Sequence, residues 1–224
     1  LRSEWKRIGT AAGELVGLGL NDGDPLVRRY AAQAASLVPT TPVAEMMRSY
    51  QKPGDPHLQH ALKIAIRERL REESAFEEIV AQNDALNDAP LIAVALALDH
   101  NAAAEYIVRE LPEKLEGWTE AQRQAYIRHA ASRAGPDSLT QLATVVKASM
   151  NLRQQRELLL VIRVGLAERG ASPPAAIAEW AEQIATELLR RSATTSKPLT
   201  WRYSPVPGEK DQGNPFVKQV RPAD

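Results

Sequence analysis

A Gly-Asp-Pro turn occurs twice in the chain, at residues 23–25 and 54–56, and each copy precedes an apolar pattern with helical spacing. The carboxylate of an Asp at the N-cap accepts backbone N–H groups of the first turn, and Pro at the first helical position already has a helical φ. Asp24-Pro25 and Asp55-Pro56 therefore predict two helix starts, and Asp88 with Pro90 predicts a third. The prolines are 31 and 34 residues apart, a spacing typical of repeated helical hairpins.

Apolar residues at helical spacing continue from these starts to residue 191. Thr119 and Asn151 are further predicted N-caps, because each precedes another apolar-periodic run. The helices that begin near residues 25, 56, 90, 120 and 152 are predicted to be the second helices of about five hairpins. The predicted buried stripe of the first of them comprises Val27, Ala31, Ala34 and Val38.

The expected fold is therefore all-α, with a stack of about five helical hairpins over residues 1–191. One hairpin cannot bury its apolar face alone, so we expect stacking to supply the stability. The composition changes at residue 192, after which the chain holds five prolines and no helical periodicity. Residues 192–224 are predicted to be a proline-rich linker or strap that leads to a following domain, with a short strand over Thr200–Tyr203.

Composition narrows the function classes. Lys and Arg number 28, as do Asp and Glu, so the formal net charge is zero and nucleic-acid binding is not expected. The absence of cysteine excludes thiolate zinc sites, iron–sulfur clusters and covalently attached c-type haem within this sequence. The sequence has no run of about 18 apolar residues, so it predicts no transmembrane helix. The chain starts at Leu1 and ends at Asp224, and we expect it to be a piece of a longer protein.

The segment 24–32, Asp-Pro-Leu-Val-Arg-Arg-Tyr-Ala-Ala, resembles a HEAT or armadillo-type repeat. That family pattern has an Asp-Pro turn, a hydrophobic residue, one or two Arg, and an Ala-rich second helix. The segment 55–60 keeps Asp-Pro and the hydrophobic residue but lacks the Arg, and later units keep only the helical spacing. The resemblance covers about residues 10–191 and implies a right-handed α-α superhelix, or solenoid.

The segment 55–67, Asp-Pro-His-Leu-Gln-His-Ala-Leu-Lys-Ile-Ala-Ile-Arg, is similar to a helix in large bacterial multidomain proteins abundant in planctomycetes. Those membrane-bound dehydrogenases join a propeller-type region, HEAT repeats and a haem-binding Cys-x-x-Cys-His module. This resemblance implies that the chain is a spacer in an electron-transfer parent. Haem would then lie elsewhere in the parent, and the protein would be periplasmic or exported.

Seven basic residues fall mainly off the predicted apolar stripes. Second helices line the concave face of a hairpin stack, so these residues predict a basic ridge that binds an acidic peptide or a phosphate backbone. The alternative interpretation is that each basic residue pairs with an Asp or Glu at a neighbouring turn. The seven candidates are Arg28, Arg29, Lys63, Arg67, Arg128, Arg156 and Arg163.

No catalytic, cofactor-binding or metal site is predicted. His57 and His60 lie near Asp55 at a helix start, but they are three residues apart, whereas zinc-binding HExxH has a spacing of four. A solvated helix end is the preferred interpretation. A run of glutamates is interleaved with arginines and predicts a helix surface of paired charges. That run comprises Glu68, Glu72, Glu73, Glu77 and Glu78, with Arg67, Arg69 and Arg71.

The favoured function is a non-catalytic scaffold or protein-interaction module, with a protein or a neighbouring domain of the same chain as its partner. One alternative is the spacer in a haem-containing dehydrogenase. Another is a nucleic-acid-binding HEAT-like domain such as a DNA glycosylase, which resembles such a stack and has a basic groove. That activity would need a carboxylate and aromatic rings facing the groove, and the nearby trio is Trp118, Glu120 and Tyr126.

Overall fold

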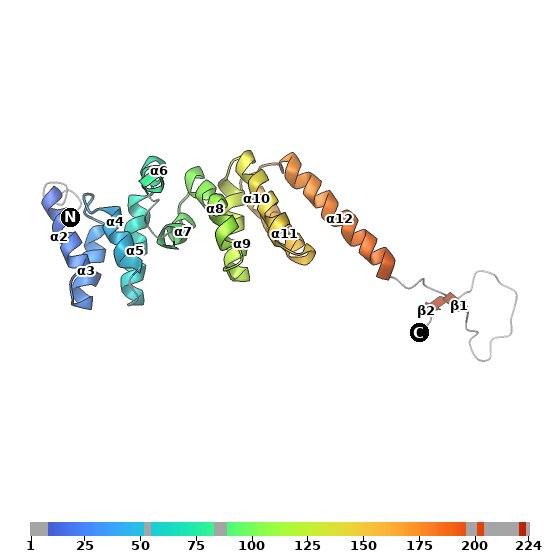
Figure 1. The fold of residues 1–224 in the computed structure, drawn as a ribbon, viewed down its shortest axis with the longest axis horizontal. Helices are drawn as coiled ribbons and strands as arrows, with labels where there is room; N and C mark the ends of the chain where they lie inside the picture. The colour runs from blue at the N-terminus through green and yellow to red at the C-terminus, as the bar shows by residue number, and fades with distance from the viewer. Residues whose placement is uncertain (1–8, 52–54, 83–88, 196–200, 204–219, 223–224) are drawn as a thin grey trace. The chain divides into compact units, whose positions relative to one another are not determined.

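A computed structural model describes residues 9–51, 55–82, 89–195, 201–203 and 220–222 (Figure 1). These residues form eleven helices and one two-stranded ribbon, so the described chain is all-helical apart from that ribbon. The chain divides into two units, residues 1–180 and 181–224. The domain boundary expected at residue 191 stays a prediction. The helices are α2 (Thr10–Leu20), α3 (Pro25–Ala35), α4 (Val43–Gln51), α5 (Pro56–Arg69), α6 (Glu73–Gln82), α7 (Ala89–Ala95), α8 (Asn101–Lys114), α9 (Glu120–Arg133), α10 (Pro136–Ser149), α11 (Leu152–Glu168) and α12 (Ala175–Thr195).

The helices α3, α5, α7, α9 and α11 begin at residues 25, 56, 89, 120 and 152, each within one residue of the predicted start. We call these the second helices, and α2, α4, α6, α8 and α10 the first helices. Carboxylates begin two of the second helices. Asp24 accepts the Leu26 N–H at 2.8 Å, and Asp55 accepts the His57 N–H at 2.9 Å. Pro25 and Pro56 each follow as the first helical residue.

Two further second helices begin with a reciprocal capping box. The Thr119 hydroxyl accepts the Gln122 N–H while the Gln122 side chain accepts the Thr119 N–H, and Asn151 and Gln154 repeat the exchange. Each box satisfies two N–H groups that the helix itself leaves without partners. The predicted cap Asp88 lies outside the described residues, and Pro90 is buried in the first turn of α7.

The helices of residues 1–180 pack against close neighbours along the chain. First helices contact first helices in the pairs α2–α4, α6–α8 and α8–α10, and second helices meet in α3–α5, α5–α7 and α9–α11. The pairs α2–α3, α4–α5, α8–α9 and α10–α11 join helices that are consecutive in sequence. Helix α7 also packs on α4 and α8. The buried residues of these interfaces are mainly Ala, Leu, Ile and Val, as the low aromatic content favours.

Glycine permits a close approach between α9 and α11. A Cβ atom on Gly165 of α11 would lie 2.6 Å from the carbonyl oxygen of Arg128 and 2.7 Å from the Cβ of Ala131, both in α9. Because carbon atoms do not approach one another this closely, any larger residue would force α9 and α11 apart. Gly17 of α2 is different, since a Cβ there would meet nothing within 4 Å.

The second unit contains the end of α12 and the ribbon. Strand β1 (Trp201–Tyr203) pairs antiparallel with β2 (Val220–Pro222), and β1 falls within the predicted strand. Within α12, hydrogen bonds from Arg190 and Arg191 lower the pKa of Glu187 to about 2. None of the helices in the described part of the chain is both long enough and apolar enough to span a bilayer.

Candidate functional site

All seven basic residues predicted to form a ridge lie on second helices, although α7 carries none of them. The two interpretations of the ridge differ in whether each basic residue is held by a carboxylate or is open to a partner. They are Arg28 and Arg29 on α3, Lys63 and Arg67 on α5, Arg128 on α9, and Arg156 and Arg163 on α11.

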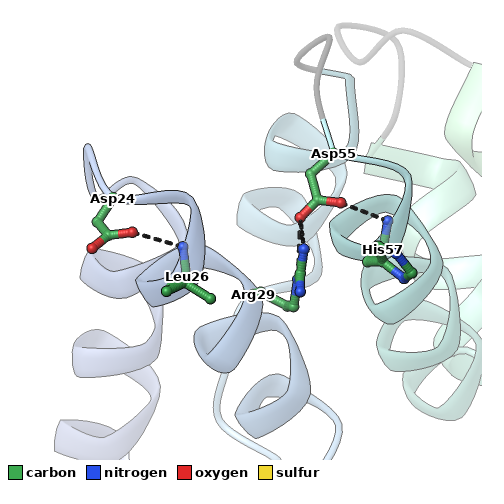
Figure 2. Close-up of polar contacts among 5 residues, drawn as sticks. All are labelled: Asp24, Leu26, Arg29, Asp55 and His57. Carbon is green, nitrogen blue, oxygen red and sulfur yellow. Dashed lines mark hydrogen bonds and ion pairs between the residues drawn. The ribbon is translucent and has the colours of Figure 1, made fainter.

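Arg29 joins two second helices. Its guanidinium, on α3, makes an ion pair with Asp55, the N-cap of α5, and Figure 2 shows it pointing directly at that carboxylate. Asp55 therefore binds Arg29 and the His57 N–H at once (Figure 2). The Arg29 hydrogen bond, followed by that of the His57 N–H, holds the pKa of Asp55 below its ordinary value.

Arg128 makes the corresponding link farther along the chain. Its guanidinium on α9 makes an ion pair with Glu168 at the end of α11. This hydrogen bond lowers the pKa of Glu168 and raises that of Arg128. Arg133 of α9 binds Asp99, which precedes α8, so α9 is tied to elements on two sides. Arg29 and Arg128 thus fit the interpretation in which basic residues pair with an Asp or Glu of a neighbouring element.

Two more of the seven are held locally. Arg28 donates to the carbonyl oxygens of Asp22 and Gly23, at 2.7 and 3.0 Å, and so closes the turn before α3. Arg67 pairs with its neighbour Glu68 at 2.9 Å. Arg28 is therefore bound to the turn before its own helix, and Arg67 to a residue of its own helix.

Lys63, Arg156 and Arg163 are the remaining candidates. Within the described residues, none of the three makes an ion pair or a side-chain hydrogen bond. Arg156 and Arg163 are exposed on α11, and Lys63 is half-buried on α5. These three residues, rather than all seven, are the basic groups available to a partner.

Exposed apolar residues gather on the same class of helix. Eight large hydrophobic residues of residues 9–180 are exposed, and six of them lie on second helices, whereas α4, α6, α8 and α10 carry none. The other two, Leu15 and Leu18, lie on α2. The six are Leu26, Val27 and Tyr30 on α3, Ile64 on α5, and Leu160 and Val164 on α11.

On α11 the exposed apolar and basic residues share one face. Arg156, Leu160, Arg163 and Val164 are spaced by four, seven and eight residues, which places them on one side of a helix. Leu160 and Val164 are each 47% exposed. We call these four residues the α11 face. The sequence predicted its arginines but not its apolar members.

The trio considered for a glycosylase has a different geometry. The rings of Trp118 and Tyr126 stack on each other at 4.3 Å between centroids, and Tyr126 is buried. Burial raises the pKa of Tyr126. Glu120, at the first position of α9, is exposed and accepts a hydrogen bond from Gln124. The stacked rings contact each other rather than present both faces to a ligand.

The four histidines lie on helices or at a helix N-cap. His57 and His60 are exposed on α5, and no group of three or more His, Asp or Glu in the described parts of the chain is arranged to hold a metal ion. His100, which the sequence did not identify as a cap, accepts the Ala103 N–H through Nδ1 at 3.2 Å and begins α8. Its Nε2 lies 3.2 Å from the Leu70 carbonyl oxygen.

Comparison with known proteins adds no family to these observations. No family model, no curated protein and no solved structure matches the chain.

Proposed function

We propose that the chain is a non-catalytic protein-interaction scaffold, built as a HEAT-like right-handed solenoid of about five hairpins. The packing partners support this proposal. Hairpin stacking requires first helices to meet first helices and second helices to meet second helices, and the contacts α2–α4, α3–α5, α8–α10 and α9–α11 follow this pattern. Around α7 the pattern changes, because α7 contacts the first helices α4 and α8 as well as the second helix α5. The ion pairs Arg29–Asp55 and Arg128–Glu168 run between neighbouring second helices in the same way.

The α11 face is the observation that carries the interaction role. Large apolar side chains that stay exposed together, with charged groups around them, mark interaction sites more often than bare solvent surface. Arginine is also among the residues that contribute most to protein interfaces, whereas an unpaired arginine contributes little to folding. Arg156 and Arg163 beside Leu160 and Val164 meet this description.

Charge reversal on this face tests the proposal. The variant Arg156→Glu/Arg163→Glu should retain the helical circular dichroism of the wild type, because neither side chain has a partner in the described residues. It should lose bound protein when the protein is purified from its own cells and its associated proteins are quantified. We expect about a tenfold loss, the size of effect typical for charged residues at an interface centre.

A matched control separates the face from overall charge. Arg71→Glu/Lys147→Glu also reverses two exposed basic residues, but Arg71 follows α5 and Lys147 lies on the first helix α10. This control should keep its associated proteins. Equal recovery of every associated protein by the wild type and the α11 variant would contradict the proposal.

The spacer role in a haem-containing, exported dehydrogenase stays a prediction of the second resemblance. A Cys-x-x-Cys-His motif in the full-length gene would support that parent, because this motif attaches c-type haem.

A further inference from the structure

A cleft lies between two first helices, on the side of the hairpins that the proposed function does not use. It has a volume of about 500 Å³ and is lined by α6 and α8. Val80 and Ala81 of α6 and Ala102 of α8 supply apolar surface, and Phe76 and Tyr106 also line the cleft. Phe76 and Tyr106 are themselves buried, so the cleft is backed by the packed core.

Two sets of contacts fix the walls of this cleft. Glu73 of α6 accepts the Ala102 N–H at 2.8 Å and so ties α6 to the first turn of α8. The ring of Phe76 packs edge-on between those of His100 and Tyr106, at centroid distances of 5.3 and 5.7 Å. Because aromatic pairs in this geometry stabilise a core, the cleft has a formed wall rather than a loose gap.

The charges that line the cleft are not balanced. Glu77 of α6 and Glu105 of α8 both line it and are exposed, and neither pairs with a Lys or Arg in the described residues. Glu105 accepts only the Asn101 amide, at 2.8 Å. Arg109 is the one cation of the lining. Its guanidinium stacks over Tyr106 at 4.9 Å and donates to Glu110, so it already interacts with two residues of its own helix, α8.

The sequence pattern did not predict this imbalance of charge. The interleaved run of Glu and Arg around residues 67–78 predicts paired charges, yet the ion pair found in its described side chains is Arg67–Glu68. Arg69 instead donates to the Thr41 carbonyl oxygen. As a result α6, which contains three glutamates and no basic residue, presents uncompensated negative charge beside the cleft.

We propose that the α6–α8 cleft binds a segment of a partner protein in which a large apolar side chain is flanked by lysine or arginine. The apolar side chain enters between Val80, Ala81 and Ala102, where it is removed from water. A neighbouring cation meets Glu77 and Glu105 on opposite walls, so one segment satisfies both features of the lining. This site is independent of the α11 face. The arginines of the α11 face favour an acidic partner, whereas the glutamates of the cleft favour a basic one.

A random library of 12-residue peptides displayed on phage tests the proposal, with the full chain immobilised. The variant Ala81→Trp is added in solution as a competitor, because its indole fills the cleft without changing the charge. Only peptides that need the open cleft then remain on the immobilised wild type. We expect these peptides to contain a large apolar residue with Lys or Arg nearby.

Selected peptides are then synthesised, and their affinities are measured by fluorescence anisotropy. Binding should weaken about tenfold in Ala81→Trp and in Glu77→Lys/Glu105→Lys, and by less than about threefold in the control Glu113→Lys/Glu116→Lys, since only the first two alter the cleft. Circular dichroism checks that each variant is folded, and the two cleft variants alter the site by different means. The proposal would be overturned if no peptides were enriched or if the enriched peptides lacked basic residues. It would also be overturned if the cleft variants bound the peptides as tightly as the wild type.

Discussion

At the scale of single residues, Asp24 and Asp55 both begin a second helix, but among the described residues only Asp55 also binds an arginine, Arg29 of α3. The Arg29 hydrogen bond lowers the pKa of Asp55 in the folded protein. The added stabilisation is therefore present above the ordinary carboxyl value of 3.8 and is lost as the pH falls through the folded pKa.

We predict that Asp24→Ala lowers the free energy of unfolding by about 1 kcal/mol, the usual value of a lost N-cap. Asp55→Ala should lower it further at pH 7, because it removes the cap and the ion pair together. Urea unfolding at pH 7 and pH 3 measures both, and the excess loss of Asp55→Ala should shrink at the lower pH. Equal losses for the two variants at pH 7 would show that Arg29–Asp55 adds nothing.

His129 of α9 predicts a second dependence on pH. Its side chain is buried, its Nε2 has no hydrogen-bond partner among the described residues, and burial followed by the charge of Arg133 lowers its pKa to about 4. Asp99 opposes this shift and His100 adds to it. At pH values between 6.5, the ordinary pKa of histidine, and about 4, His129 is protonated in the unfolded chain but neutral in the folded chain.

The free energy of unfolding should therefore fall as the pH is lowered through that window, with no further contribution from His129 below about pH 4. In His129→Leu this part of the slope should disappear, whereas His60→Asn, at an exposed position, should keep it. Chemical unfolding at intervals of half a pH unit measures the slopes. Identical slopes for the wild type and His129→Leu would mean that His129 titrates alike in both states.

At the scale of helices, two glycines give opposite predictions for the same substitution. Gly165→Ala should destabilise the protein by about 1–3 kcal/mol, because its Cβ would overlap Arg128 and Ala131 across the α9–α11 interface. Gly17→Ala should stabilise it by about 0.5–1 kcal/mol, since its Cβ meets open space and alanine favours a helix. Thermal and urea unfolding of the pair measure both signs. Stabilisation by Gly165→Ala would contradict the close approach of the two helices.

Helix starts were predictable because capping is local, and the starts of the second helices are accurate to one residue. The buried face of α3 was predicted in part. Ala31 and Val38 are buried, but Val27 is 40% exposed and Ala32 and Ala35 are buried in addition. Helix α3 packs on both α2 and α5, so more than one of its faces is buried. A Cβ atom on Gly19 of α2 would lie 2.9 Å from the Cβ of Ala31, so the two helices are close at that point. Periodicity alone does not distinguish two apolar faces on one helix.

At the scale of the whole molecule, the sequence predicted an all-helical chain and placed the basic residues on second helices. It did not predict their partners, because Arg29–Asp55 and Arg128–Glu168 join residues 26 and 40 positions apart. Such pairs depend on the relative heights of neighbouring helices, which no local pattern encodes. The same reason hid the unpaired glutamates beside the α6–α8 cleft.

Site-specific photo-cross-linking in the protein's own cells tests the central claim, that the α11 face binds protein. A photoreactive residue at Leu160 on the α11 face should cross-link to another protein or domain, whereas one at the exposed Gln141 of the first helix α10 should not. No cross-link at Leu160, or equal cross-linking at both positions, would contradict the account.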